Sequence, residues 1–559
     1  MSVVLSEHLP LLASAPDGIQ KLRGLILELA VRGKLVPQDP NDEPASELLK
    51  RIAKVRARLE AEGSCKKSKA TPLDSEGAPP FELPAGWALS QLSDLTLVLN
   101  GRAYSKDELL SEGVPVLRVG NLFTSNHWYY SNLQLEDDKY CDQGDLLYSW
   151  SASFGPFIWQ GPKVIYHYHI WKLRLFDESS LSKEFFYKFL LEKTAEIKAA
   201  GHGVSMIHMT KEKMEKILVP IPPFAEQHRI VAKVDELMAL CDRLESEVGA
   251  GETAHARLVE TLLGTLTQST DAAELAANWQ RLAEHFDTFF TTEASLDALK
   301  QTILQLAVMG KLVPQDPNDE PAKELLKRIA KERARLEAEG RIKKSQPVPS
   351  VGEDELPFEV PPTWAWVRLS DVTTKITDGT HHSPPNLSAG DFKYISAKNI
   401  KRWGIDQSGM TFVTKEIHKE IYSRCNPERG DILYIKDGAT TGIAAINTLD
   451  EPFSMLSSVA LLKPSIGLFN RYLYFLMSSP LFYDEMRAGM TGVAITRVTL
   501  AKLNVALLPL PPLPEQHRIV TKVDELMALC DRLKADLADS RTRQARLSTT
   551  LIDAALEAA

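Results

Sequence analysis

Two segments of the sequence occur twice, and this repetition limits the architectures open to the chain. Residues 33–63 (GKLVPQDPNDEPASELLKRIAKVRARLEAEG) recur at 310–340 with an offset of 277, and residues 222–244 (PPFAEQHRIVAKVDELMALCDRL) recur at 511–533 with an offset of 289. The segments between these blocks share only short fragments, such as GDLLY and GDILY. Because a repeat at a fixed offset marks a repeated structural unit, the pattern predicts one scaffold that carries two different modules.

The order of the blocks divides the chain into five regions. We call the first block with the helix expected before it the head, the second block the tail, and the variable segment between them the insert. The boundaries are a helical N-terminal region at 1–77, a first insert at 78–220, a central helical region at 221–354, a second insert at 355–510 and a C-terminal helix at 511–559.

The repeated blocks have the apolar spacing of paired helices. Alternating steps of four and three residues are typical of a coiled-coil seam, and in the two tails they predict helix pairing through Ile230, Val234, Leu237, Cys241, Leu244, Ile519, Val523, Leu526, Cys530 and Leu533. The heads show a similar seam from Ala45 to Leu59, after Pro44 at the expected first helical position. An earlier helix is expected at 17–32, and the tail helix should run from 224 to about 266. The alternative for each seam is ordinary amphipathic packing of a single helix.

The order of the blocks also predicts a topology. The middle of the chain has a tail followed by a head, and the chain ends supply the complementary head and tail. If these end segments pack together, the chain closes into a ring. We therefore expect an α+β protein in which two mixed α/β modules are joined by long antiparallel coiled-coil helices, in a pseudo-twofold circular arrangement.

Each insert contains β-branched and aromatic runs, such as VPVLRVGNLF and DILYIKDG, separated by Gly, Asn and Asp. A helical pattern follows at 181–199 and at 468–486. Both inserts are therefore expected to be mixed α/β modules.

The net charge of −9 is distributed unevenly. Residues 81–220 hold 14 basic and 17 acidic side chains, and residues 358–510 hold 16 and 14. The inserts are thus nearly neutral, and most of the negative charge lies on the helical scaffold. An acidic average therefore does not exclude nucleic-acid binding by the inserts.

Basic, amide, hydroxyl and aromatic residues gather in several loops of the inserts. Arg and Lys suit phosphates and guanine, Asn suits adenine, and Thr can contact a thymine methyl group. The DNA-binding candidates are Asn100, Arg102, Tyr104, Ser105, His127, Lys163, His167, His169, His202, Thr380, His381, His382, Lys398, Asn399, Lys401, Arg402, Lys436, Thr440, Thr441, Thr496 and Arg497. The alternative for each cluster is a solvated loop.

Enzyme motifs are weak or absent. Asp177 and Glu196-Ile197-Lys198 only loosely resemble a nuclease carboxylate pair, which must converge on Mg²⁺. Ser383-Pro384-Pro385-Asn386 lacks the aromatic fourth residue of an amino-methyltransferase loop. We expect no catalytic residue and no metal site, although a stand-alone nuclease or methyltransferase and a protein-binding coiled-coil adaptor remain alternatives.

Composition predicts a reducing compartment. The five cysteines are scattered, without a CxxC pair. A secretory leader and a membrane span are not expected from the apolar pattern.

The doubled signature resembles the specificity (HsdS-type) subunits of type I restriction-modification enzymes. Its entry motif reads Leu83-Pro84-Ala85-Gly86-Trp87 with Leu92-Ser93-Asp94, and the second copy keeps Trp364 after Pro361-Pro362-Thr363. Its exit motif reads IPPFAEQHRI from Ile221 and LPPLPEQHRI from Leu510.

The resemblance implies that each insert is a target-recognition domain that reads one half of a bipartite, asymmetric site in double-stranded DNA. It also implies helices that space the two domains and dock two methyltransferase (M) subunits, with translocase-nuclease (R) subunits completing a bacterial, cytoplasmic complex. The chain would hold no cofactor, because S-adenosylmethionine, ATP and Mg²⁺ would bind the partner subunits.

Overall fold

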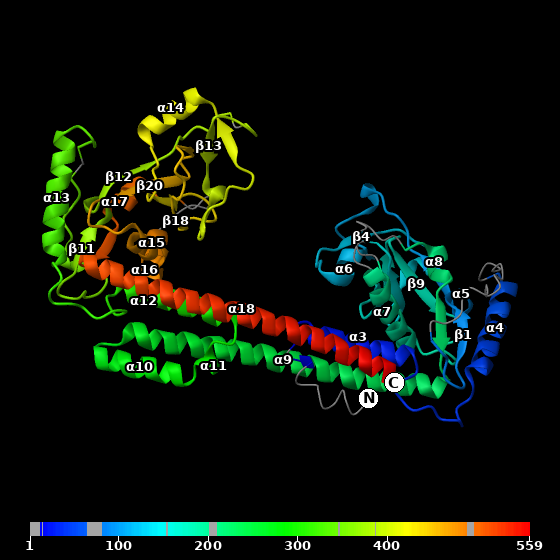
Figure 1. Ribbon diagram of the computed structural model, residues 1–559. Helices are drawn as coiled ribbons and strands as arrows, with labels where there is room; N and C mark the ends of the chain where they lie inside the picture. The colour runs from blue at the N-terminus through cyan, green and yellow to red at the C-terminus, as the bar shows by residue number, and fades with distance from the viewer. Residues whose placement is uncertain are drawn as a thin grey trace. The chain divides into compact units, whose positions relative to one another are not determined.

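The computed structural model describes residues 12–13, 15–63, 81–151, 155–200, 209–344, 347–385, 387–488 and 497–558 (Figure 1). The chain divides into two compact units, one formed by residues 1–251 and 540–559 and the other by residues 252–539. Each unit therefore contains one insert, one head, the start of its own tail helix and the end of the other tail helix.

The two tails form the longest helices of the described chain, α9 (Phe224–Gln268) and α18 (Leu513–Ala558). In the first unit, α3 (Gly18–Val31) lies against both of them. Arg23 Nη2 contacts Asp242 Oδ1 of α9 at 2.6 Å, and Lys21 Nζ donates to Thr549 Oγ1 of α18 at 2.9 Å. The predicted contact between the N-terminal head and the C-terminal tail is thus present.

The second unit repeats these contacts around α12 (Glu293–Val308). Lys300 pairs with Asp531, and these residues occupy the repeat positions of Arg23 and Asp242. Lys534 Nζ contacts Asp297 Oδ2 at 3.0 Å. Lys300 follows Asp297 along α12, whereas its partner Asp531 precedes Lys534 along α18, so the two helices are antiparallel.

The predicted tail seams are the buried sides of these helices. The residues in the hydrophobic cores of the two units are Ile230, Val234, Leu237, Cys241, Ile519, Val523 and Cys530, and those partly buried against the cores are Leu244, Leu526 and Leu533. The end of α9 contributes Val259, Leu263 and Leu266 to the second core, and the end of α18 contributes Ile552 and Ala555 to the first.

The predicted pairing of the later head helices is wrong. These helices are α4 (Ala45–Ala61) and α13 (Ala322–Ala338), and each lies against its insert. Arg51 Nε donates to Ser180 Oγ of the first insert at 3.1 Å, and Arg333 donates to backbone carbonyls beside the first strands of the second insert. Only the first half of the predicted seam in α4 is buried, namely Ala45, Leu48 and Ile52. The buried part is too short for pairing along the whole helix. Pro44 is also the N-cap rather than the first helical residue.

The described residues of the first insert form three sheets and the helix α7 (Lys183–Ala200). Its ends are joined by antiparallel pairing of β1 (Ala88–Gln91) with β10 (Leu218–Ile221). A four-stranded sheet has the order β2 (Thr96–Asn100), β9 (Ile170–Leu175), β6 (Leu146–Ser149) and β7 (Gly155–Ile158). A second has the order β4 (Tyr129–Ser131), β3 (Val114–Leu117), β8 (Val164–Tyr166) and β5 (Tyr140–Cys141). The short helices are α5 (Leu92–Leu95), η1 (Lys106–Glu108), α6 (Val119–Phe123), η2 (Asp137–Lys139) and α8 (Lys211–Glu215).

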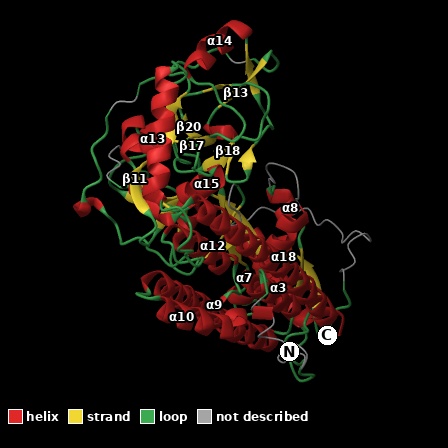
Figure 2. Cartoon of the chain, turned by 60° about the vertical axis from the view of Figure 1, so that its left-hand side comes forward, coloured by secondary structure: helices red, strands yellow, loops and turns green. Residues whose placement is uncertain are grey.

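The second insert repeats the paired ends and the four-stranded main sheet, and Figure 2 shows its strands in yellow. Its ends pair through β11 (Ala365–Arg368) and β21 (Leu507–Leu510), and its main sheet has the order β12 (Thr373–Asp378), β20 (Val459–Pro464), β17 (Ile432–Ile435) and β18 (Ala444–Ile446). A three-stranded sheet has the order β16 (Thr411–Val413), β13 (Phe392–Ile395) and β19 (Ser454–Met455). Its helices are α14 (Lys415–Arg424), α15 (Asn470–Ser478), α16 (Pro480–Arg487) and α17 (Leu500–Val505). The predicted helix at 468–486 is therefore two helices, because Ser479 caps a new helix at Pro480.

The second unit also contains the helices α10 (Ala272–Glu284) and α11 (Phe286–Phe289) and the short 3₁₀ helices η3 (Glu353–Glu355), η4 (Leu369–Asp371) and η5 (Ala397–Asn399). The prediction of two mixed α/β modules on long paired helices is confirmed.

The repeated EQHR motif attaches each insert to its helices. Glu226 is buried and accepts hydrogen bonds from Trp87 Nε1 at 3.1 Å and from Gln38 Nε2 at 3.2 Å, while burial raises the pKa of its carboxyl group. Gln227 accepts the backbone N–H of Ser182 at 2.7 Å. In the second unit Gln516 likewise accepts the N–H of Phe469 at 2.8 Å.

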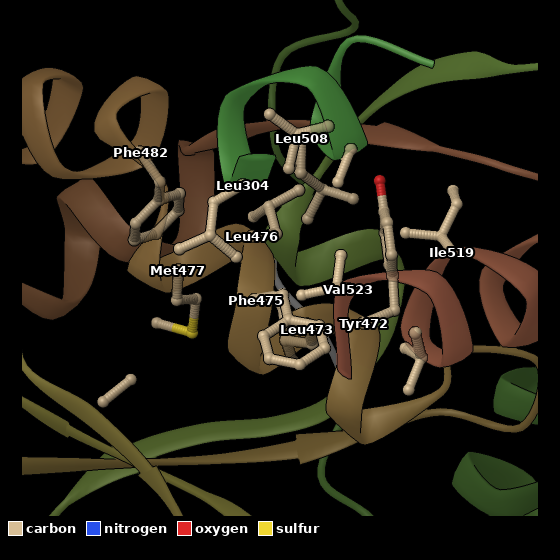
Figure 3. Packing of buried hydrophobic residues seen from close by; sticks show 14 of the residues in the cluster. Leu304, Tyr472, Leu473, Phe475, Leu476, Met477, Phe482, Leu508, Ile519 and Val523 are labelled. Atoms are coloured by element: carbon tan, nitrogen blue, oxygen red, sulfur yellow. The ribbon is translucent and has the colours of Figure 1, made fainter. Parts of the chain in front are cut away.

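Apolar packing completes this attachment. Figure 3 shows α15 of the second insert packed against residues of α12, β21 and α18. Tyr472 is fully buried there, and its hydroxyl donates to the carbonyl of Pro509 at 2.7 Å.

Candidate nucleic-acid interface

A glycine fixes the same loop in both inserts. Gly101 follows β2 and Gly379 follows β12, and a Cβ atom at either position would collide with a backbone carbonyl, that of His167 or of Met455. The chain can therefore pass this close only without a side chain. The next residues, Arg102 and Thr380, form parallel bridges to His167 and Leu456 and so occupy equivalent positions.

Further backbone hydrogen bonds bring three loops together at this end of each main sheet. In the first insert Tyr168 N donates to Arg102 O at 3.0 Å, and Trp150 N donates to His169 O at 3.1 Å. In the second insert the equivalent bonds are Ser457 N to Thr380 O at 2.8 Å and Lys436 N to Ser458 O at 3.0 Å. The backbone is thus repeated, whereas the side chains differ.

In the first insert these loops form an aromatic cluster of Tyr104, Trp150, His167, Tyr168 and His169. The ring centroids of Trp150 and His169 are 5.0 Å apart, those of Tyr168 and His169 are 3.9 Å apart, and Tyr104 stacks on His167 at 6.4 Å. Tyr168 is 40% exposed. Aromatic and imidazole groups at a surface can stack on bases and donate or accept hydrogen bonds.

The positive charge of Arg102 beside this cluster is compensated by a carboxylate. Arg102 Nη2 contacts Glu108 Oε1 at 2.6 Å, and this contact together with the backbone N–H of Ser105 lowers the pKa of Glu108 to about 2. Burial, His169 and Arg118 lower the pKa of His167 to about 4. His167 is therefore neutral at pH 7, which leaves it one donor and one acceptor nitrogen.

In the second insert the loops form a charged network of Asp378, His381, Arg424, Lys436, Asp437 and Arg497. Asp378 is 2% exposed and contacts Arg424, the Nζ atom of Lys436 at 3.4 Å and the Nε2 atom of His381 at 3.4 Å. Lys436 Nζ also contacts Asp437 at 3.1 Å, and Asp437 contacts Arg497 Nε at 2.9 Å. About half of each Arg424 and Arg497 side chain is exposed, so the network holds two guanidinium groups at the surface. Such groups suit phosphate oxygens and guanine.

The structure places several predicted residues inside the fold. Lys436 is 3% exposed and Thr441 is 2% exposed, with its hydroxyl donating to Gly438 O at 2.7 Å. Asn399 is 8% exposed and uses its side-chain amide in its own turn, accepting from Ser396 N at 3.1 Å and donating to Asp406 O at 3.2 Å. These three side chains have internal partners, and their predicted DNA contacts remain predictions.

The other candidates lie nearer the surface. The exposed ones are Asn100, Ser105, His127, Lys163, His381, His382, Lys398, Arg402, Thr440 and Arg497, and the partly exposed ones are Arg102, Tyr104, His167, His169, Thr380 and Lys401. Two candidates, His202 and Thr496, fall outside the described residues.

Residues at or beside these loops that are absent from the predicted candidates include Trp150, Arg118 and Arg424, the last residue of α14. Arg424 lies 46 positions from its partner Asp378, so no local pattern marks it. Trp150 directly follows β6, and Arg118 lies over the ring of Tyr129 at 5.1 Å. Of these residues, only Trp150 is marked by a local sequence pattern, an aromatic residue directly after a buried strand.

The weak nuclease pattern has structural partners. Asp177 accepts hydrogen bonds from Ser179 and Ser180, and Glu196 pairs with Lys193 at 2.5 Å. Within the part of the chain that the structure describes, no group of three His, Cys, Asp or Glu residues is placed to hold a metal ion. A helix long and apolar enough to cross a membrane is likewise not found among the described residues.

Comparison with known proteins identifies the class to which these two inserts belong. The family model described as "Type I restriction modification DNA specificity domain" matches residues 84–249 and 361–539. The chain therefore belongs to the specificity subunits of type I restriction-modification systems.

Particular relatives agree with this family. The chain is 38% identical to the type I restriction enzyme EcoAI specificity subunit of Escherichia coli, over 96% of this chain and 94% of that protein. It is 36% identical to the EcoEI specificity subunit of the same species, with the same coverage. A solved chain from a study of complex assembly in a type I R-M system is 19% identical, with a TM-score of 0.46 and coverage of 85% of this chain and 98% of that chain. Membership thus rests on the sequence matches.

Proposed function

We propose that this subunit selects the DNA site of a type I restriction-modification complex, with each insert reading one half of a bipartite, asymmetric duplex site. The observation that carries the proposal is the repeated loop backbone with unlike side chains. Arg102, Trp150 and Tyr168 in the first insert correspond to Thr380, Lys436 and Ser457 in the second. Equivalent positions with different donors, acceptors and rings suit two different base sequences.

The helical scaffold is proposed to space the inserts and to dock two M subunits. The matching contacts Arg23–Asp242 and Lys300–Asp531 support two equivalent docking surfaces, one in each unit. Most of the net negative charge lies on this scaffold, which favours protein partners over DNA there.

Catalysis is assigned to the partner subunits. Adenine-N6 methylation by M, with the target base flipped out of the duplex, and ATP-dependent restriction by R would use S-adenosylmethionine, ATP and Mg²⁺ bound to those subunits. The complex is proposed to act in the cytoplasm, where this chain contributes recognition without chemistry of its own.

Footprinting of the complex of this chain with its M subunits tests the proposal. We expect protection of two separated segments in a duplex carrying the cognate site, and no protection when either half is scrambled. Complex formation without any sequence-dependent footprint would favour a protein-binding adaptor and refute the proposal.

A further inference from the structure

A short hairpin of the second insert carries the most exposed large apolar side chain among the described residues. Strands β14 (Ile400–Lys401) and β15 (Gly404–Ile405) pair antiparallel, with Lys401 opposite Gly404. The two-residue turn between them consists of Arg402 and Trp403, and Trp403 is 74% exposed. Exposure of this size is unusual for an indole, because burial of its large apolar surface stabilises a fold or an interface.

The base of the hairpin is firmly held. Ile400 is 1% exposed and Ile405 is 7% exposed within a hydrophobic core that includes β17 residues. The hydroxyl of Tyr474 on α15 donates to the carbonyl of Arg402 at 2.6 Å. Gly404 adopts φ +139°, which a side chain would disfavour. The turn therefore presents Trp403 from a fixed backbone.

The charge around the indole favours a polyanion. Residues 398–405 (KNIKRWGI) contain three basic side chains and no acidic one. Lys398 and Arg402 are exposed and Lys401 is partly exposed. The next acidic residue, Asp406, accepts the N–H and the hydroxyl of Ser408 at 2.9 and 2.7 Å, so its carboxylate is engaged in its own turn.

The hairpin is also continuous with the charged network. Ser458 accepts from Ala397 N through its hydroxyl at 3.3 Å and from Lys436 N through its carbonyl at 3.0 Å. One residue thus joins the turn that leads into the hairpin to the loop that carries the network. In the first insert, the equivalent turn leads to Phe123, which is 41% exposed.

We propose that Trp403 contacts the duplex read by the second insert, with its indole against base and sugar edges in a groove and with Lys401 and Arg402 on the flanking phosphates. The inference rests on the proposed function. Aromatic and apolar side chains that enter grooves or stack on bases add affinity, while adjacent basic residues fix the register on the backbone.

Binding measurements on Trp403→Ala test this inference, with Ile466→Ala as the matched control. Ile466 is 60% exposed in the same insert and lies outside the hairpin. In complex with the M subunits, Trp403→Ala should weaken binding to the cognate duplex by about tenfold, the effect of losing one stacked ring. Ile466→Ala should leave binding unchanged, and Trp403→Phe should retain most of it. Melting temperatures of all three variants should match the unsubstituted chain, because both side chains are exposed.

Photo-cross-linking identifies the occupant. With p-benzoylphenylalanine in place of Trp403, we expect a cross-link to cognate DNA. A cross-link to an M subunit alone, or full affinity of Trp403→Ala in a complex that still discriminates its site, would overturn this inference and leave the proposed function intact. If the unsubstituted complex shows no site preference, the proposed function itself fails.

Discussion

Replacement of Asp378 by Asn should destabilise the second insert strongly, because this carboxylate balances buried positive charge. Asp378 is 2% exposed and its partner Lys436 is 3% exposed, so neither group is compensated by bulk water. Removing one member of a buried ion pair costs about 3–5 kcal/mol. Lys436 keeps Asp437 at 3.1 Å, so the lower end of that range, about 3 kcal/mol, is expected.

Calorimetry of the complete chain measures the effect. A loss of about 3 kcal/mol corresponds to a fall in Tm of roughly 6–12 °C for a domain of about 150 residues, the size of the second insert. Asp450→Asn is the matched control, because Asp450 is 76% exposed in a surface pair with Arg429. That variant should change stability by less than about 0.5 kcal/mol.

A second substitution separates charge from packing. Lys436→Met in the Asp378→Asn background should recover part of the lost Tm, because it removes the charge that the first change leaves underneutralised. A Tm for Asp378→Asn within about 1 °C of the unsubstituted chain would show that the network is solvated and that Asp378 does not compensate buried charge.

Three further predictions concern the helices, the aromatic cluster and the thiols. Val523→Ala, at a fully buried seam position of α18, should cost about 2 kcal/mol in urea unfolding, whereas Val505→Ala, at a position 38% exposed, should cost much less. The pKa of His167 is lowered to about 4, so between pH 6.5 and 4 the unfolded chain binds a proton that the folded chain does not. Stability should therefore fall as the pH falls through that window. His167→Gln should flatten this part of the profile of Tm against pH, and an unchanged profile would contradict the lowered pKa. Burial raises the pKa of the thiols of Cys141 and Cys425 to about 12, so iodoacetamide at pH 8 should modify neither in the folded chain, as peptide mass spectrometry would show.

The helical scaffold could be predicted from the sequence because its signals are local and repeated. The tail seam beginning at Ile230 and Ile519 marks both the helix and its buried side. The same kind of pattern from Ala45 correctly predicts the helix α4 but wrongly predicts that it pairs with another helix. An amphipathic stripe shows that one side is covered, and it does not specify whether a helix or a sheet covers it.

The candidate interface was predictable in part. Loops that follow strands at Asn100-Gly101 and Asp378-Gly379 stood out by composition, and the structure brings them to equivalent places. The pairing of Asp378 with Arg424 depends on tertiary contacts between residues far apart in the sequence. The internal use of the Asn399 amide depends on turn geometry that composition does not reveal.

Sequencing of methylated adenines after exchange of one insert shows whether each insert reads its own half-site. Residues 78–220 of this chain would replace the corresponding insert of a related specificity subunit in cells that contain matching M subunits. We expect one half of the methylated site to change to that of this chain, while the other half and the gap stay as they were. A change in both halves, or in neither, would contradict the claim that each insert reads its own half-site.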